Sequence, residues 1–174
     1  MPGGMISHQA VGAFGERAVE AELLRNGWIP ANVNATVKNA ADFDIYALKG
    51  TCTVHLRVKT CGPDIAGLQF GGLPVGSVVS SDGIAGSDFT ILVRMSTRRS
   101  DDQFYVVPTA VVRKEIAARQ KDYLKQPRRD GKSRKDTGHW LLRWRERKNE
   151  KEEGGWGIAK KWAQYLENWP LLES

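Results

Sequence analysis

The chain has 174 residues and a formal net charge of +6, and this length predicts one domain with a core of ordinary size. No run of about 18 apolar residues predicts a membrane span, and the start lacks the charged-then-apolar order of a secretory signal, so a cytoplasmic protein is expected. Cys52 and Cys61 are too far apart along one extended segment to form a disulfide, and the three histidines lack zinc-site spacing.

The first predicted element is a helix over about residues 8–26, ended by Gly27. Apolar residues recur there at helical spacing: Val11, Phe14, Ala18 and Ala21. Glu16 and Glu20 lie four residues apart and therefore share one helix face. These two acids are either solvated residues of that face or acids that reach a site formed later in the chain.

A short strand is predicted over residues 28–34, near a sheet edge because Pro30 interrupts it. After a loop rich in asparagine and small residues, apolar and polar residues alternate over residues 42–48 and again over residues 52–60. Gly50 lies between these two segments. The pattern predicts two antiparallel strands joined by a tight turn.

Side chains alternate between the two faces of a strand, so each predicted strand has an apolar and a polar face. On the second strand His55, Arg57 and Lys59 share the polar face, and Asp44 lies on the polar face of the first. The polar faces of the pair can therefore bring Asp44 and Lys59 together. An acid beside a lysine suits phosphodiester chemistry, because a carboxylate binds Mg²⁺ and an ammonium can position or deprotonate the attacking water.

The second half of the core begins with a segment rich in Gly and Ser over residues 61–87, either a surface loop or a mobile flap over the site. Within it, residues 73–80 are compatible with a weak helix or a strand. Residues 88–95 and 103–108 predict buried strands, and a helix follows from Thr109, a plausible cap.

The positive charge gathers between Arg113 and Lys148, where 14 Lys and Arg stand against 5 Asp and Glu. Residues 125–135 read as a charged linker or exposed loop, and residues 139–148 as a strand or a helix that alternates Trp with Arg. A terminal amphipathic helix is predicted over residues 156–166. The residues predicted to bind nucleic acid are Arg57, Arg128, Arg129, Lys132, Arg134, Lys135, Arg143 and Arg145.

The Asp44 and Lys59 pair, set in a helix-strand-strand-strand order, resembles the PD-(D/E)XK nuclease family with its restriction-endonuclease-like fold. In that family an Asp on one strand is followed by a Glu-, Asp- or Gln-x-Lys triplet on the next. Here Asp44 matches the Asp and Lys59 the Lys, but the triplet reads Arg57-Val58-Lys59. A guanidinium cannot ligate a metal ion, so another acid would have to complete the site. The candidates are Asp42, Glu16 and Glu20.

The resemblance implies an α/β fold with a central mixed sheet of four to five strands flanked by helices, in the order α-β-β-β-(loop)-β-β-α. Residues 1–124 would form this core, and residues 125–174 a basic linker and a Trp-rich helical extension packed on the same domain. The implied activity is metal-dependent hydrolysis of DNA phosphodiester bonds. Asp44 and Lys59 would be catalytic together with Glu16 or Glu20, and Asp44, Glu16 and Asp42 would hold Mg²⁺ or Mn²⁺.

Two other functions remain open at this point. In the first, the fold is kept without the chemistry, and Arg57 binds phosphate in a nucleic-acid-binding or structural protein. In the second, the Trp-rich C-terminal helix binds a protein. The expected partner is DNA, with RNA as the alternative and no membrane, and because many relatives are dimers the resemblance also admits a homodimer.

Overall fold

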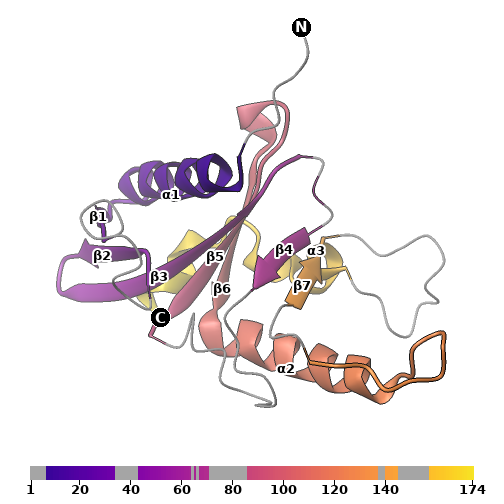
Figure 1. The fold of residues 1–174 in the computed structure, drawn as a ribbon. Helices are drawn as coiled ribbons and strands as arrows, with labels where there is room; N and C mark the ends of the chain where they lie inside the picture. Colours follow the sequence, from indigo (N-terminus) through magenta and orange to yellow (C-terminus); the bar gives the residue numbers. More distant parts are fainter. Residues whose placement is uncertain are drawn as a thin grey trace, which may run out of the picture.

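A computed structural model describes residues 7–33, 43–63, 65, 67–70, 86–136, 140–144 and 157–174. The described chain has an α/β fold in which a mixed five-stranded sheet has one helix packed on each face (Figure 1). This is the fold class that the sequence predicts.

The first helix, α1 (His8–Arg25), matches the predicted opening helix. The Ser7 hydroxyl caps it by accepting the Ala10 N–H at 3.2 Å, and Gly27 follows its end with a φ of +79°. The buried face of α1 consists of Gly15, Ala18, Val19 and Leu23. Phe14, one of the apolar residues at helical spacing, is 36% exposed instead.

The sheet has the strand order β1-β2-β3-β5-β6. Its strands are β1 (Ile29–Asn32), β2 (Ile45–Lys49), β3 (Cys52–Cys61), β5 (Phe89–Arg94) and β6 (Gln103–Pro108). Only the β3–β5 pair is parallel among these neighbours, and the other three pairs are antiparallel. The predicted hairpin is present, and Gly50 adopts the left-handed conformation its tight turn requires, with a φ of +59°.

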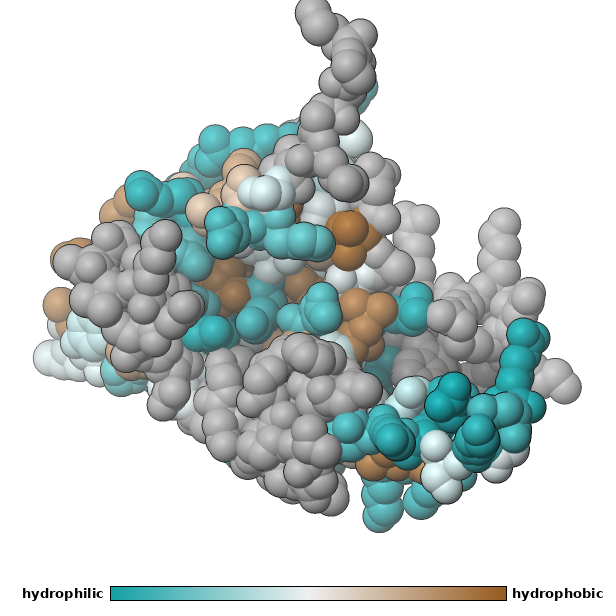
Figure 2. Space-filling model, in the orientation of Figure 1, coloured by the Kyte–Doolittle hydropathy of each residue, from teal (hydrophilic) through white to brown (hydrophobic). Residues whose placement is uncertain are grey.

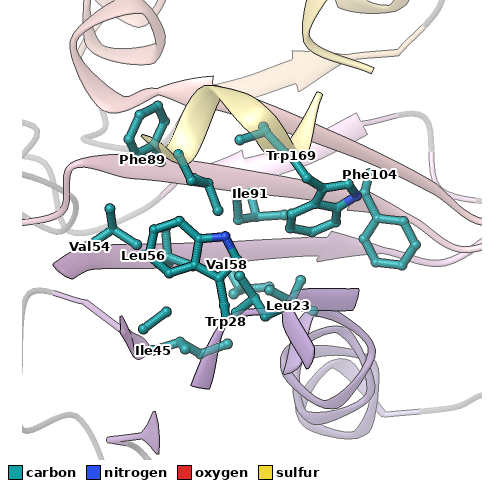
Figure 3. Packing of buried hydrophobic residues seen from close by; sticks show 14 of the residues in the cluster. Leu23, Trp28, Ile45, Val54, Leu56, Val58, Phe89, Ile91, Phe104 and Trp169 are labelled. Carbon is teal, nitrogen blue, oxygen red and sulfur yellow. The ribbon is translucent and has the colours of Figure 1, made fainter. Parts of the chain in front are cut away.

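The two faces of the sheet lie in two separate buried clusters. On one face, Val54, Leu56 and Val58 of β3 pack with α1 and with Trp28 (Figure 3). On the other face, α2 (Thr109–Lys125) covers β5 and β6 with Val112 and Ile116. Because side chains alternate along β3, its odd-numbered residues His55, Arg57 and Lys59 belong to the face that α2 partly covers.

A second, two-stranded sheet lies beside β3. It corrects the expectation of a loop over residues 61–87 and decides between the strand and the helix expected over residues 139–148. The predicted Gly-rich loop contains β4 (Gly67–Phe70), which pairs antiparallel with β7 (Trp140–Arg143). The Trp-Arg stretch is thus a strand where it is described. A Cβ added at Gly67 would lie 2.1 Å from the Leu142 carbonyl oxygen, so this close pairing requires glycine. The undecided residues 73–80 lie outside the described residues.

The C-terminal segment is less helical than predicted. Within the expected helix of residues 156–166 the described helix α3 (Ile158–Lys161) has four residues, followed by the short 3-10 helices Ala163–Tyr165 and Trp169–Glu173. Trp169 joins the α1 cluster against Phe104, and Trp162 joins the α2 cluster. None of the described helices is both long and apolar enough to cross a membrane.

Candidate functional site

The β2–β3 hairpin brings Asp44 beside Arg57. The register pairs Ile45 with Leu56, and the Asp44 N–H donates to the Leu56 carbonyl at 2.8 Å, so Asp44 lies across from Arg57. Ile45 and Leu56 are fully buried in the α1 cluster. Their neighbours Asp44 and Arg57 therefore point to the opposite face, where Lys59 also lies.

Both carboxylate oxygens of Asp44 are engaged. Oδ1 lies 3.2 Å from Arg57 Nη1, and Oδ2 accepts the Val58 N–H at 2.7 Å. Asp44 is only 4% exposed, and a buried carboxylate is tolerated when an opposite charge and hydrogen-bond donors compensate for its lost hydration. The Asp44–Arg57 ion pair thus supplies the opposite charge that this buried carboxylate needs.

Lys59 lies one step further along the same face. Its Nζ is 5.7 Å from the centroid of the Phe70 ring on β4. Burial lowers the pKa of Lys59, the neighbouring Arg57 lowers it further, and Asp44 acts in the opposite direction. A lysine in these surroundings releases its proton more readily than a solvated lysine does.

Arg57 gives this face of the hairpin a net positive formal charge. With Asp44 negative and both Arg57 and Lys59 positive, the group of three carries a formal charge of +1. Arg57 Nε is buried and has no hydrogen-bond partner among the described residues. The guanidinium therefore keeps a donor that its contact with Asp44 does not use.

The acids proposed to complete a metal site are not gathered around Asp44 in the part of the chain that the structure describes. Glu16 Oε2 accepts a hydrogen bond from Asn32 Nδ2 on β1 at 2.9 Å, and Glu20 lies 4.0 Å from Arg17 on its own helix. Asp42 lies outside the described residues.

The described donor set does not fit a divalent metal ion. No group of three His, Cys, Asp or Glu residues within the described ranges is arranged to hold one. Mg²⁺ and Mn²⁺ need several oxygen ligands, whereas Asp44 has both oxygens engaged and faces a guanidinium. We therefore assign no chemical step to a metal ion at this site.

Close packing fixes α1 against the strand that carries Lys59. A Cβ added at Gly15 would lie 1.7 Å from Thr60 Oγ1, so only glycine permits α1 to approach β3 at this point. Glu16 follows Gly15 directly, and its bond to Asn32 ties the helix to β1 as well. The sequence singled out Glu16 for chemistry, but its described contact joins α1 to the sheet.

Most of the basic residues predicted to bind nucleic acid lie beyond the C-terminal end of α2, away from the β2–β3 hairpin (Figure 1). Arg128, Arg129, Lys132 and Lys135 are exposed in this loop. The loop is closed by a hydrogen bond from the Arg128 N–H to the Lys132 carbonyl at 2.8 Å. It forms a strongly hydrophilic end of the molecule (Figure 2).

The other predicted basic residues occupy different settings. Arg134 is held against the protein, because its guanidinium lies 4.5 Å from the Tyr123 ring centroid and its Nε donates to the Gln126 carbonyl at 3.0 Å. Arg143 lies on β7, and Arg145 lies outside the described residues.

Sequence reasoning passed over one polar pair on the Asp44 face. His55 Nδ1 lies 3.1 Å from Asp88 Oδ2, the same oxygen that accepts the His55 backbone N–H at 2.8 Å. Strand alternation places His55 on the same face as Arg57, but His55 and Asp88 are 33 residues apart in the sequence and no local pattern predicts their contact.

Comparisons with known proteins support the fold of the chain but do not assign it to a family. No family model and no curated protein sequence matches the chain. The structure of a bacterial homing endonuclease, I-Ssp6803I, matches with a TM-score of 0.53 and 12% identity, covering 96% of this chain and 93% of that one. The crystal structure of MepB matches with a TM-score of 0.31, 11% identity and coverages of 77% and 91%, too weakly to carry an argument. The chain therefore has a nuclease-like α/β fold.

Proposed function

We propose that the chain is a nuclease of the PD-(D/E)XK type that hydrolyses phosphodiester bonds of DNA on the Asp44 face of the sheet. The observation that carries the proposal is the row of Arg57 and Lys59 beside Asp44 on the polar side of the β2–β3 hairpin. The likeness in fold between this chain and a homing endonuclease supports phosphodiester hydrolysis as the reaction class.

Each residue of the site has a role that follows from its contacts. Arg57 offers a guanidinium to a backbone phosphate, and Lys59 places a second cation beside it, so that both stabilise the negative charge that grows on the phosphoryl oxygens. Asp44 holds Arg57 in place through the 3.2 Å contact. In this arrangement Asp44 is a positioning residue.

The basic loop after α2 would bind the DNA backbone at a distance from the site. It contributes Arg128, Arg129, Lys132 and Lys135, and Arg143 on β7 adds a further cation. Contacts between such side chains and phosphates position the duplex without reading its sequence. Each lost phosphate contact should reduce the salt dependence of duplex binding by about one unit of slope in log K against log salt.

A second candidate is a nucleic-acid-binding protein of the same fold that does not cleave. The Asp44–Arg57 ion pair favours it, because Arg57 occupies the position where the family has a metal-binding acid. In this case Arg57 and Lys59 bind phosphate and the bond stays intact. DNA is the expected ligand, and an RNA duplex of the same length is the comparison that decides between the two nucleic acids.

One cleavage experiment separates the two functions. Supercoiled plasmid is incubated with the protein in Mg²⁺, in Mn²⁺ and in EDTA, beside Lys59→Ala, Asp44→Ala and the control Lys114→Ala, which removes an exposed positive charge on α2. Nicking that the first two substitutions abolish and the control preserves supports the nuclease. Salt-sensitive binding without nicking under any condition supports the binding protein.

The predicted metal ion is tested separately by Arg57→Glu. This substitution would place a second carboxylate beside Asp44 and restore the acid-x-Lys triplet, so calorimetry should register tighter binding of Mn²⁺ than in the wild type. Unchanged titrations would contradict the assigned geometry. The predicted homodimer is tested by the mass of the protein in solution, measured by light scattering.

A further inference from the structure

His55 has the contacts of an oriented imidazole. The Asp88 carboxylate accepts hydrogen bonds only, so in a neutral ring Nδ1 carries the proton and Nε2 keeps a lone pair. The ring is flanked by Phe43, with centroids 4.5 Å apart, and by Tyr46 at 5.6 Å. Its side chain is 38% exposed, so a ligand can reach it.

His55, Arg57 and Lys59 form one row along β3. Alternate residues of a strand are about 6.7 Å apart, so about 13 Å separate the first and last members of the row at the backbone. A phosphate held by Arg57 in the middle would have His55 on one side and Lys59 on the other. Phosphoryl displacement needs this arrangement, because the attacking and leaving oxygens lie roughly in line with phosphorus.

We propose that His55, held by Asp88, is the proton acceptor that activates water in this site. The inference rests on the proposed nuclease function and adds a group that the family motif does not contain. It also explains how water could be activated although the described acids do not fit a metal ion. The imidazole lone pair accepts the proton of the attacking water, a step that a metal ion would otherwise make easier.

The step balances with groups on this face. His55 Nε2 takes a proton from water while the water oxygen forms a bond to phosphorus and the phosphorus–oxygen bond to the leaving sugar breaks. The Lys59 ammonium gives its proton to the leaving oxygen, and Arg57 compensates the charge on the remaining oxygens. His55 then loses its proton to solvent and Lys59 regains one, so that one water is consumed for each bond cleaved.

The kinetic test compares His55→Gln with His8→Gln, which alters an exposed histidine at the start of α1. Plasmid cleavage by His55→Gln should be slower by about 10²- to 10⁴-fold, with duplex affinity within threefold of the wild type. Asp88→Asn should slow cleavage less, because the imidazole keeps its lone pair and loses only the carboxylate that orients it. Cleavage by His55→Gln within threefold of the wild type would overturn the inference while leaving the nuclease in place.

The dependence of the cleavage rate on pH distinguishes a proton acceptor from a residue with a purely structural role, because only the former should change the shape of the profile. The wild-type rate should fall on the acid side, because a protonated imidazole cannot accept a proton from water. Among the described residues, Asp88 and Tyr46 contact His55 directly, and Asp44, Arg57 and Lys59 lie on the same face of the hairpin. In His55→Gln the acid limb should disappear from the residual rate, and a limb that persists unchanged would assign it to another group.

A measurement without turnover completes the test. The His55 ring proton resonance is identified by its loss in His55→Gln, and its titration midpoint is measured by NMR with and without inorganic phosphate. Phosphate on Arg57 should raise the midpoint, because an adjacent anion favours imidazolium. An unchanged midpoint would show that no phosphate sits beside His55 and would overturn the inference. Failure of the wild type to cleave under any condition would remove the nuclease itself.

Discussion

The ion pair between Asp44 and Arg57 is expected to be energetically coupled, and a double-mutant cycle measures the coupling. Two unit charges 3.2 Å apart attract by about 5 kcal/mol at an effective dielectric constant of about 20. Lost hydration and the 22% exposure of the Arg57 side chain reduce this to a net coupling of about 1–3 kcal/mol. Arg57→Met alone should cost about 3 kcal/mol, because it leaves the buried Asp44 carboxylate without its counter-charge.

The cycle uses Asp44→Asn and Arg57→Met singly and together. Asparagine keeps an oxygen for the Val58 N–H, and methionine keeps most of the arginine stem, so each change removes mainly charge. Urea unfolding followed by tryptophan fluorescence gives the free energy of unfolding, provided that the m-values agree. The double variant should lose less than the sum of the single losses.

A matched cycle on an exposed pair provides the reference. Lys49 Nζ lies 2.6 Å from Glu173 Oε1, but the two side chains are 37% and 50% exposed. Solvent screening should limit their coupling to less than about 1 kcal/mol. A coupling below about 0.5 kcal/mol for Asp44 and Arg57, or one no larger than that of the exposed pair, would refute the view that Arg57 compensates the Asp44 charge.

Three further predictions concern packing and ionisation. Gly15→Ala should destabilise the fold by about 1–3 kcal/mol, because the new methyl group would clash with β3. Gly12→Ala, on the same helix, places its methyl group in open space and should stabilise the fold by up to about 1 kcal/mol. Urea unfolding measures both changes. Burial alone would raise the pKa of Glu115, but hydrogen bonds from Lys161 and a neighbouring arginine lower it overall. Stability from this carboxylate is therefore present above its unfolded pKa and lost as the pH falls through its folded pKa, so Glu115→Gln should flatten the acid side of a plot of melting temperature against pH. Burial raises the pKa of the Cys61 thiol. Cys61 should therefore react with a thiol-specific reagent at pH 8 more slowly than Cys52, the partly exposed thiol at the other end of β3.

The local features of the fold were predictable because they follow from patterns within a few residues. Alternation of apolar and polar residues along the β2–β3 hairpin is enough to predict that Asp44, Arg57 and Lys59 share one face. Helical spacing located α1, but it did not choose the buried stripe: Phe14 is partly exposed, while Val19 and Leu23 are buried. Several apolar stripes fit one helix, and only the sheet beneath it decides among them.

The features that were missed depend on contacts between distant segments. β4 lies in a Gly-rich stretch with little strand propensity, and it becomes a strand because β7, more than 65 residues later, offers a partner. The approach of Asp88 to His55 arises in the same way, from the parallel pairing of β3 with β5. Neither pairing leaves a trace in the sequence near the residues concerned.

The arginine in the triplet alters what its neighbours can do. A glutamate at position 57 would give the group of Asp44, residue 57 and Lys59 a formal charge of −1, which attracts a divalent cation, whereas Arg57 gives it +1, which attracts a phosphate. The same arginine lowers the pKa of Lys59, where a carboxylate would raise it, so Lys59 becomes better suited to donate a proton. A site changed in this way needs a proton acceptor from elsewhere on its face. His55, two residues away and already held by Asp88, is placed to be that acceptor.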